Sequence, residues 1–364
     1  MTRRMQRPKA SVDLKEVFIR TIPVAIRRWL AVLALVGIVS ITILELLAIS
    51  LSAQTVVRMS QPTEALSFLV LYAARANKFF EEEGITLELI IMQGGGPELQ
   101  ALIAGSVDFS ATGTAGLIRA FSGGGELLGV QNILGRCVVD LVIRKDSAKR
   151  LGITSEMTVE ERLRRLKGAK VGASRIGALT YQIPFFLAKE VGLEPGRDVT
   201  ILGVGGGASQ FASFNTGHID VISSSPPYPA AAIKQGDGLM LVANTKGEYP
   251  KLRSFLQQLL LVRPEFARQN PDLVRKVVRA LVRGNRWVAE NDSQEVAKVV
   301  AKFFRQTPLD VLVSTVEAIK LAVIPDGQIT VDGLRGVEAV LRANGIIKQA
   351  VPWDRLVTNE FLPR

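Results

Sequence analysis

Short runs of aliphatic and β-branched residues alternate along the chain with segments whose apolar residues recur at helical spacing. The runs at 55–60 and 85–92 predict strands, and the segment 66–83 between them predicts a helix. A strand, a helix and a second strand in this order form a βαβ unit, in which the two strands are parallel. The pattern therefore predicts an α/β fold.

One glycine-rich pattern occurs twice. GGGPELQALIAGSVDF begins at Gly94 and GGGASQFASFNTGHIDV begins at Gly205; each has three glycines, a short segment of helical period and a final Gly-x-Val/Ile-Asp. Short strands predicted before the second copy place it in a block like the first. Asp108 and Asp220 are predicted to lie in helix-to-strand turns. Two similar half-structures are therefore expected.

Two apolar runs with similar ends follow the two blocks. They are VVDLVIRKD at 138–146 and QLLLVRPE at 258–265, and both are predicted to be hinge strands that cross between two lobes. Because the chain would pass from the first lobe to the second and later return, the first lobe is expected to contain 54–140 plus 264–364. The second lobe is expected to contain 146–257.

The chain beyond residue 264 is helical in period. Helices are predicted at 271–290, 293–304, 309–321 and 331–344, with prolines in two of the breaks. These helices are expected to cover the first lobe.

The first 53 residues contain an uncharged apolar stretch. WLAVLALVGIVSITIL starts at Trp29, follows Arg27-Arg28 and is succeeded by small residues up to Ala53. A basic, an apolar and a small-residue region in this order are typical of a signal peptide, here cleaved after Ala53. An uncleaved N-terminal membrane anchor is the alternative. Both interpretations predict a periplasmic body, in the second case tethered to the inner membrane.

Composition excludes several classes of protein. The chain is 48% hydrophobic and 22% charged, which is a globular balance. The net charge is +11 at pH 7, but no basic run with interleaved aromatics is present, so nucleic acid is not an expected partner. One cysteine and one histidine exclude a disulfide framework and a His/Cys metal cluster from one chain. Cys137 lies in an apolar run and is predicted to be a buried, inert thiol.

The chain lacks the complete form of several familiar catalytic and cofactor-binding motifs. The glycines at 94–96 lack the Gly-Lys-Ser/Thr of an NTPase loop. Gly203 to Ala208 match the G-x-G-x-x-A pattern of dinucleotide-binding loops. In such sites an acidic residue at the C-terminal end of the next strand binds the ribose, whereas Asp220 stands at the start of its strand. His218 lies in a turn and no nucleophile elbow is present. Glycine loops that lead into helices can instead bring backbone N–H groups close to an anionic ligand. We therefore predict ligand binding without catalysis and without a cofactor.

Several segments resemble one family when they are taken in order and at their spacing. The family is the nitrate/taurine/alkanesulfonate and thiamine-precursor type of periplasmic substrate-binding protein, the soluble receptor of ABC importers. The resemblance covers about 57–345. The segments that carry it best are FFEEEGITLEL (79–89), ALIAGSVDF (101–109), LVIRKDS (141–147), LRRLKGAKVGAS (163–174), NTGHIDV (215–221) and PDGQIT (325–330).

The resemblance implies a type II periplasmic-binding-protein fold, in which two α/β lobes joined by two hinge strands hold a small molecule between them. It also implies a monomer that works with ABC permease and ATPase subunits. The implied ligand is a sulfonate, a carboxylate, a nitrate-like ion or a heterocycle. The residues that match the ligand loops of the family are Gln61, Ser67, Gln93, Gly94, Gly95, Thr112, Gly113, Thr114, Ser174, Gly177, Thr180, Ser223, Ser225 and Tyr228.

Two arginines indicate the charge of the ligand. Arg175 follows a predicted strand and precedes a predicted helix, so that its guanidinium could stand beside the free N–H groups of that helix. Arg136 comes just before the first crossing. Together with the basic body, both favour an anionic or strongly polar ligand. The usual Trp-Glu-Pro of the second lobe is Ser224-Ser225-Pro226 here, so the resemblance does not assign a particular ligand.

Two other functions remain open from the sequence. A thiamine-pyrimidine-synthase-like enzyme shares the scaffold, but it needs a cysteine-rich iron motif and an active-site histidine, whereas Cys137 stands alone and His218 lies in a turn. A membrane-tethered domain that senses the same kind of ligand without a transporter is the other alternative.

Overall fold

The computed structural model describes Trp29 and residues 54–62, 64–92, 96–305 and 307–364. The predicted signal peptide or anchor at 1–53 lies outside the described residues, apart from Trp29. Residues 54–364 form one unit. Within the described part of the chain, no helix combines the length and the apolar character needed to cross a membrane.

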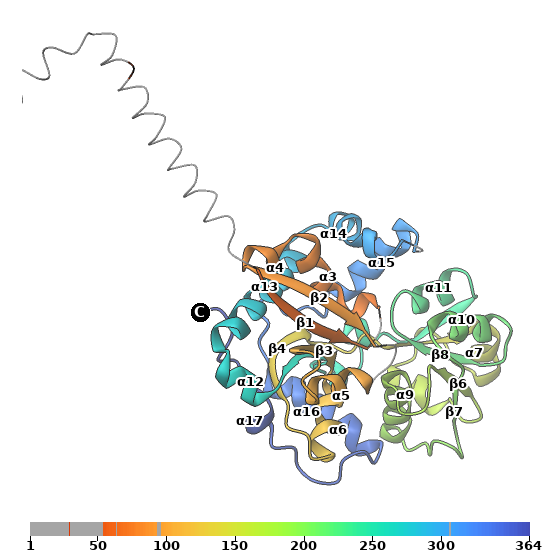
Figure 1. Ribbon diagram of the computed structural model, residues 1–364. Coiled ribbons are helices and arrows are strands. Elements are labelled where there is room, and N and C mark those ends of the chain that lie inside the picture. Colours follow the sequence, from red (N-terminus) through yellow and green to blue (C-terminus); the bar gives the residue numbers. More distant parts are fainter. Residues whose placement is uncertain (1–28, 30–53, 63, 93–95, 306) are drawn as a thin grey trace, which may run out of the picture. The chain divides into compact units, whose positions relative to one another are not determined.

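Two mixed five-stranded sheets form the framework (Figure 1). The first sheet has the order β2-β1-β3-β10-β4, and the second has the order β7-β6-β8-β5-β9. The strands of the first sheet are β1 (Thr55–Gln61), β2 (Ile85–Ile91), β3 (Phe109–Gly113), β4 (Leu128–Leu134) and β10 (Gln258–Val262). Those of the second are β5 (Asp140–Arg144), β6 (Lys170–Ala173), β7 (Thr200–Gly203), β8 (Val221–Ser224) and β9 (Gly238–Val242).

The two sheets have the same topology. In the first, β1 is parallel to β2 and β3, while β10 is antiparallel to β3 and β4. In the second, β6 is parallel to β7 and β8, while β5 is antiparallel to β8 and β9. Each sheet therefore has one antiparallel strand in the same place. The prediction of two similar half-structures is confirmed.

The two apolar runs are these antiparallel strands. The run at 138–146 contains β5 and the run at 258–265 contains β10, so each run contributes a strand to one sheet. The chain passes between the sheets just before each strand, at 135–139 and at 243–257. The lobe boundaries that we place near these segments stay a prediction.

Matching contacts at the helix-to-strand turns explain why the glycine pattern is repeated. Asp108 Oδ2 accepts a hydrogen bond of 2.8 Å from the backbone N–H of Arg58, and Asp220 Oδ2 accepts one of 2.8 Å from that of Lys170. Each aspartate thus fastens its strand to the neighbouring parallel strand. The prediction that both are turn residues is confirmed, because each lies just before its strand.

An arginine at the end of each antiparallel strand caps the repeated helix: Arg144 is the last residue of β5, and Arg263 directly follows β10. Arg263 Nη1 donates to the carbonyl oxygens of Leu102 at 2.6 Å and Val107 at 2.7 Å, at the end of α5 (Pro97–Ile103). Arg144 Nη1 donates to the carbonyl oxygen of Phe214 at 2.8 Å, at the end of α10 (Gly207–Asn215). These contacts account for the similar ends of the two apolar runs.

Replacing Arg263 with alanine should destabilise the protein, because two part-buried carbonyl groups lose their charged donor. We expect the free energy of unfolding to fall by about 2 kcal/mol. Urea unfolding of the full chain, followed by circular dichroism, measures the change. Arg268→Ala is the matched control, since Arg268 lies exposed on α12 (Pro264–Gln269). Equal midpoints for the two variants would contradict a capping role for Arg263.

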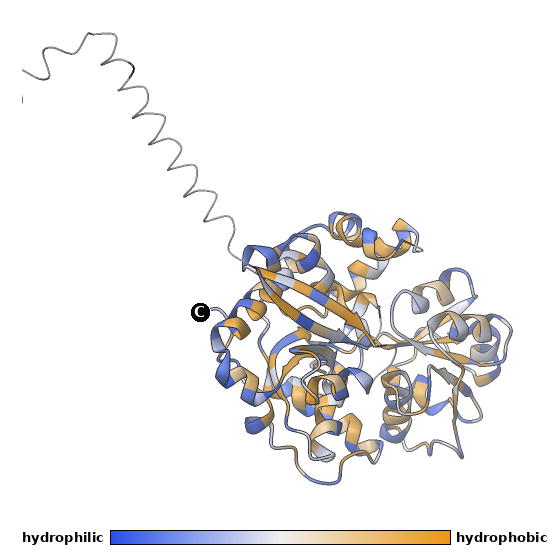
Figure 2. Ribbon diagram, in the orientation of Figure 1, coloured by the Kyte–Doolittle hydropathy of each residue, from blue (hydrophilic) through white to orange (hydrophobic). Residues whose placement is uncertain are grey.

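Helices with both hydrophobic and hydrophilic residues cover the sheets (Figure 2). One core packs α3 (Leu69–Ala76), α13 (Pro271–Glu290) and α14 (Ser293–Val300) against one face of the first sheet. A second core joins the other face of that sheet to one face of the second sheet. Alternation along β5 shows the second sheet to be covered on both faces, because Leu141 and Ile143 belong to the second core and Val142 to a third.

The remaining helices connect these layers. They are α4 (Phe79–Glu82), α6 (Thr114–Ser122), α7 (Lys145–Leu151), α8 (Val159–Arg164), α9 (Leu179–Glu190), α11 (Tyr228–Lys234), α15 (Leu309–Lys320), α16 (Val331–Ala343) and α17 (Trp353–Leu356), with short 3-10 turns η1 (Leu66–Phe68), η2 (Asn244–Lys246), η3 (Pro250–Leu252) and η4 (Ala301–Phe303).

Two sequence expectations about helices need correction. The single helix predicted at 66–83 is divided into η1, α3 and α4; the chain turns between α3 and α4 at Lys78, which has a left-handed backbone with φ 59°. The C-terminal helices do not only cover the first sheet. Helix α16 packs against both α6 and α9, and the Asn344 amide after it donates to the carbonyl oxygen of Gln182 at 3.0 Å.

Candidate functional site

A pocket of about 260 Å³ lies where loops of the two sheets meet, and we call it the front pocket. Its walls come from the residues after β1, β3, β6 and β8, from the first turns of α5, α6 and α9, and from the crossing residues Val139 and Gln257. The carboxyl ends of the parallel strands of both sheets therefore face it. Ligands of open α/β sheets bind at this edge.

Eight residues predicted from the sequence line the front pocket. They are Ser67, Thr112, Gly113, Ser174, Arg175, Gly177, Thr180 and Ser225. Gln93, Gly94 and Gly95 lie outside the described residues. The structure thus brings together loops that are far apart in the chain, as the repeated pattern implies.

The other five predicted residues do not line this pocket. Gln61 is buried and its amide donates to the Tyr72 hydroxyl at 3.1 Å. Thr114 and Ser223 are buried beneath the wall. The ring of Tyr228 lies so close to Gly207 that a Cβ there would meet it at 2.0 Å.

Arg136 is the fifth of these residues. Burial, and secondly the neighbouring Arg253, lower the pKa of its guanidinium. Its Nη1 lies near Gly247, 3.6 Å from the position of a Cβ on that glycine. The crossing segment therefore directs Arg136 toward the second crossing and not toward the front pocket.

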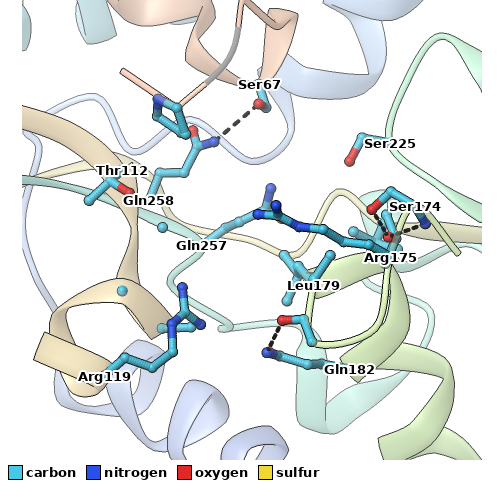
Figure 3. A pocket seen from close by; sticks show the side chains of 18 of the residues that line it. Ser67, Thr112, Arg119, Ser174, Arg175, Leu179, Gln182, Ser225, Gln257 and Gln258 are labelled. Carbon is cyan, nitrogen blue, oxygen red and sulfur yellow. Dashed lines mark hydrogen bonds between the residues drawn. The ribbon is translucent and has the colours of Figure 1, made fainter. Parts of the chain in front are cut away.

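Two arginines enter the front pocket from opposite sides. Arg119 comes from α6 and Arg175 from the loop between β6 and α9, and Figure 3 shows both side chains extending into the space between them. Sequence analysis missed Arg119. A signal was present, because Ala115, Gly116 and Arg119 are spaced to share one face of a helix that begins at a predicted ligand loop.

The electrostatics of the pocket favour an anion. Arg119 is solvent-accessible but is surrounded by protein on several sides, so burial lowers the pKa of its guanidinium; Glu98 raises that pKa and Arg175 lowers it. An arginine stays protonated at neutral pH even so. Two like charges therefore face each other, and an anion placed between them would be attracted by both.

The backbone of the first glycine loop is bound by the carboxylate of Glu98, which follows the loop in the chain. Glu98 is buried in the pocket wall, and it accepts hydrogen bonds from the Gly96 N–H at 2.6 Å and from the Thr112 hydroxyl at 3.0 Å. The N–H of Gly96 is therefore already satisfied. Helices α6 and α9 also begin at the pocket, and the positive ends of their dipoles favour a negative ligand group.

Three glutamines complete the polar lining. Gln257 Oε1 accepts from the Val138 N–H at 2.8 Å and so links the two crossing segments. Gln258 donates to the Ser67 hydroxyl at 3.1 Å, and Gln182 donates to the carbonyl oxygen of Gly177 at 2.8 Å. The Oε1 atoms of Gln182 and Gln258 are buried without a hydrogen-bond partner among the described residues. A ligand could donate a hydrogen bond to either oxygen only if the glutamine side chain turned it toward the pocket.

The two residues considered for catalysis, Cys137 and His218, do not line the front pocket. Cys137 is buried, which confirms the prediction, and burial raises the pKa of its thiol to about 12. His218 is exposed in the turn after α10. Across the ranges that the structure describes, no group of three or more His, Cys, Asp or Glu side chains is placed to hold a metal ion.

The two sheets of equal topology and the front pocket between them define the two-lobed type II periplasmic-binding-protein fold, as expected. The chain belongs to the NMT1-like family, whose model matches residues 66–304. The resemblance found in the sequence is thereby confirmed.

Known proteins of this fold cover most of the chain. The periplasmic aliphatic sulphonate binding protein SsuA from Escherichia coli is 18% identical, with a TM-score of 0.65, over 82% of this chain and 91% of SsuA. The periplasmic nitrate-binding protein NrtA from Synechocystis PCC 6803 is 13% identical, with a TM-score of 0.65, over 84% of this chain and 87% of NrtA. The putative binding protein YtlA of Bacillus subtilis is 20% identical over 313 residues, which are 84% of this chain and 89% of YtlA.

Proposed function

We propose that the chain is an extracytoplasmic solute-binding protein that captures a small anionic or strongly polar organic molecule in the front pocket and delivers it to an ABC importer. The observation that carries the proposal is the pair of guanidinium groups, Arg119 and Arg175, that face one pocket from elements of different sheets. The relatives named for binding sulphonate and nitrate, which are anions, support the same class of ligand.

Binding between the two arginines would also link capture to closure. A guanidinium from each side can donate paired hydrogen bonds to a sulfonate, carboxylate or nitrate-like group. Such a ligand makes both sets of contacts only when the two sides approach it, so it stabilises the closed arrangement more than the open one. The closed form would then be the one recognised by the permease and ATPase subunits.

Turned toward the pocket, the side-chain oxygens of Gln182 and Gln258, which have no partner among the described residues, would suit a second ligand group that carries an N–H or O–H donor. A sulfonate or carboxylate with an amino or hydroxyl group, or a heterocycle with a ring N–H, meets both requirements. We propose binding and not catalysis, because the thiol of Cys137 is buried and its pKa is raised to about 12. The ligand should therefore be recovered unchanged.

Calorimetric titration of the full chain with matched anions and neutral analogues tests the proposal. The panel pairs methanesulfonate with dimethyl sulfone and acetate with acetamide, and adds nitrate, taurine and an anionic heterocycle. We expect at least one anion to bind at least about tenfold more tightly than its neutral partner, a difference of about 1.4 kcal/mol. Equal binding of a neutral partner, or no binding by any anion, would contradict the proposed ligand class.

A further inference from the structure

A second pocket of about 340 Å³ lies behind the front pocket, and we call it the rear pocket. Consecutive residues separate the two: Val139 and Ser225 line the front pocket, whereas Asp140 and Pro226 line the rear one. The other walls of the rear pocket come from α11, from η2 and from α15. The rear pocket is therefore a distinct cavity, separated from the front pocket by the start of β5 and the residues that follow β8.

The walls of the rear pocket are mainly apolar. The apolar side chains that the argument uses are Pro226, Pro227, Pro229, Ile233, Met240 and Leu321. Two of them are unusually exposed for their type, with 37% of Ile233 and 51% of Leu321 accessible to solvent. Ile233 lies on α11 and Leu321 directly follows α15, so apolar surface is left open on both rims. Covering this surface with a hydrocarbon group would be favourable.

Two buried polar groups stand out against these apolar walls. Asp140 is 6% exposed, and its Oδ1 accepts a hydrogen bond of 2.8 Å from the Thr245 N–H. Thr315 on α15 is 2% exposed, and its hydroxyl has no hydrogen-bond partner within the described residues. The rear pocket thus combines a carboxyl group, an unpaired hydroxyl and a hydrocarbon lining.

We propose that the rear pocket binds a small, mainly apolar amine, with its ammonium group against Asp140 and its hydrocarbon part against the prolines, Ile233 and Leu321. Asp140 forms no salt bridge in the described part of the chain, and an ionised carboxylate inside a protein is unfavourable unless it is paired. Lys246 also lines the pocket and lowers the pKa of Asp140, but it forms no salt bridge with that carboxylate. An ammonium placed against Asp140 would supply this close pairing and a donor for the Thr315 hydroxyl. The volume lies at the small end of ligand sites.

The charged groups around Asp140 define how binding depends on pH. Burial raises the pKa of Asp140 to about 6, the Thr245 N–H and Lys246 lower it, and Glu248 raises it. From α15 the exposed Glu317 also lines the pocket, while α11 contributes only apolar side chains there. Asp140 is therefore ionised above pH 6 and neutral well below it. Amine affinity should be full at pH 8 and should fall as the pH drops through about 6.

Titration of the full chain with cyclohexylamine and with cyclohexanol tests the proposal. The two molecules have the same ring, but only the amine is cationic at pH 8. We expect the amine to bind at least about tenfold more tightly than the alcohol at pH 8. Binding should also shift the methyl signals of Ile233 and Met240 in an NMR spectrum, which places the amine in the rear pocket.

Two variants separate the charge of the pocket from its shape. Asp140→Asn keeps an acceptor for the Thr245 N–H and should reduce amine binding to the level of the alcohol. Ala318→Phe fills the pocket from α15 and should abolish binding of both molecules, whereas Ala212→Phe, at an exposed site on α10, should change neither. Equal affinities of amine and alcohol, no amine binding, or unchanged binding by Ala318→Phe would each overturn the proposal. The result does not depend on the ligand of the front pocket.

Discussion

Replacing both Arg119 and Arg175 with alanine should abolish anion binding without unfolding the protein. Each guanidinium is expected to contribute a charged hydrogen bond, so each single variant should weaken an anion by roughly 10- to 100-fold. The double variant should lose more than either single one. Glu98, the buried carboxylate near Arg119, keeps its hydrogen bonds from the Gly96 N–H and the Thr112 hydroxyl when Arg119 is removed, so the fold should persist. Titration with the anion identified for the front pocket measures the losses.

Arg136→Ala is the matched control for this prediction. Arg136 is a half-buried arginine in the first crossing segment, but it lies beside Arg253 and Gly247 and does not line the front pocket. We expect its removal to leave anion affinity within about threefold of the unchanged chain. If Arg136→Ala costs as much affinity as Arg119→Ala, the ligand does not sit between Arg119 and Arg175. Lysine at position 119 or 175 should give an intermediate loss, because it keeps the charge but not the planar donor fork.

Asn285→Leu should be among the most destabilising single changes in the protein. Asn285 is fully buried on α13; its amide donates to the carbonyl oxygen of Ile324 at 2.8 Å, and its Oδ1 accepts from the Gln131 side chain at 2.9 Å. Leucine would leave the buried Gln131 amide without its acceptor, whereas the Ile324 carbonyl oxygen would keep its hydrogen bond of 3.0 Å from the Gly327 N–H. At about 1–3 kcal/mol for an unsatisfied buried group, we expect a loss of about 2–3 kcal/mol in the free energy of unfolding.

Urea unfolding checks this loss against Asn291→Leu. Among the described residues, the Asn291 amide donates at 2.8 Å only to the carbonyl oxygen of Trp287, at the end of the same helix, so its replacement should cost well under half as much. A similar midpoint for both variants would show that the link from α13 to β4 and to the segment before α16 adds little stability.

The local pattern of apolar and polar residues was sufficient to predict most helices and strands. The helices predicted at 271–290, 309–321 and 331–344 agree with α13, α15 and α16 to within one residue, because the period of a helix and its proline breaks are recorded in neighbouring residues. The division of 66–83 into three pieces was not predicted. The break between α3 and α4 depends on a left-handed turn at Lys78, a conformation that a lysine adopts only where its surroundings demand it.

The front pocket was predicted in part. Its loops follow from the repeated glycine pattern and the strand ends, and eight of the predicted residues line it. Arg119 and Gln182 lie within helices, where a residue reaches the pocket only if its helix presents that face. Gln257 and Gln258 come from the second crossing and β10, and they line the pocket because β10 pairs with β3 and β4. No local pattern records such a pairing.

The sequence by itself determined the α/β class, the internal repeat, the family and the loops that lead to the ligand edge, because each depends on periodicity or on short motifs. Only the tertiary structure decided which charges meet. It placed Arg119 opposite Arg175, directed Arg136 toward Arg253, and set Asp140 against a second, apolar pocket. The physical reason is that side chains far apart in the chain acquire common neighbours only when two sheets of the same topology pack with their strand ends together.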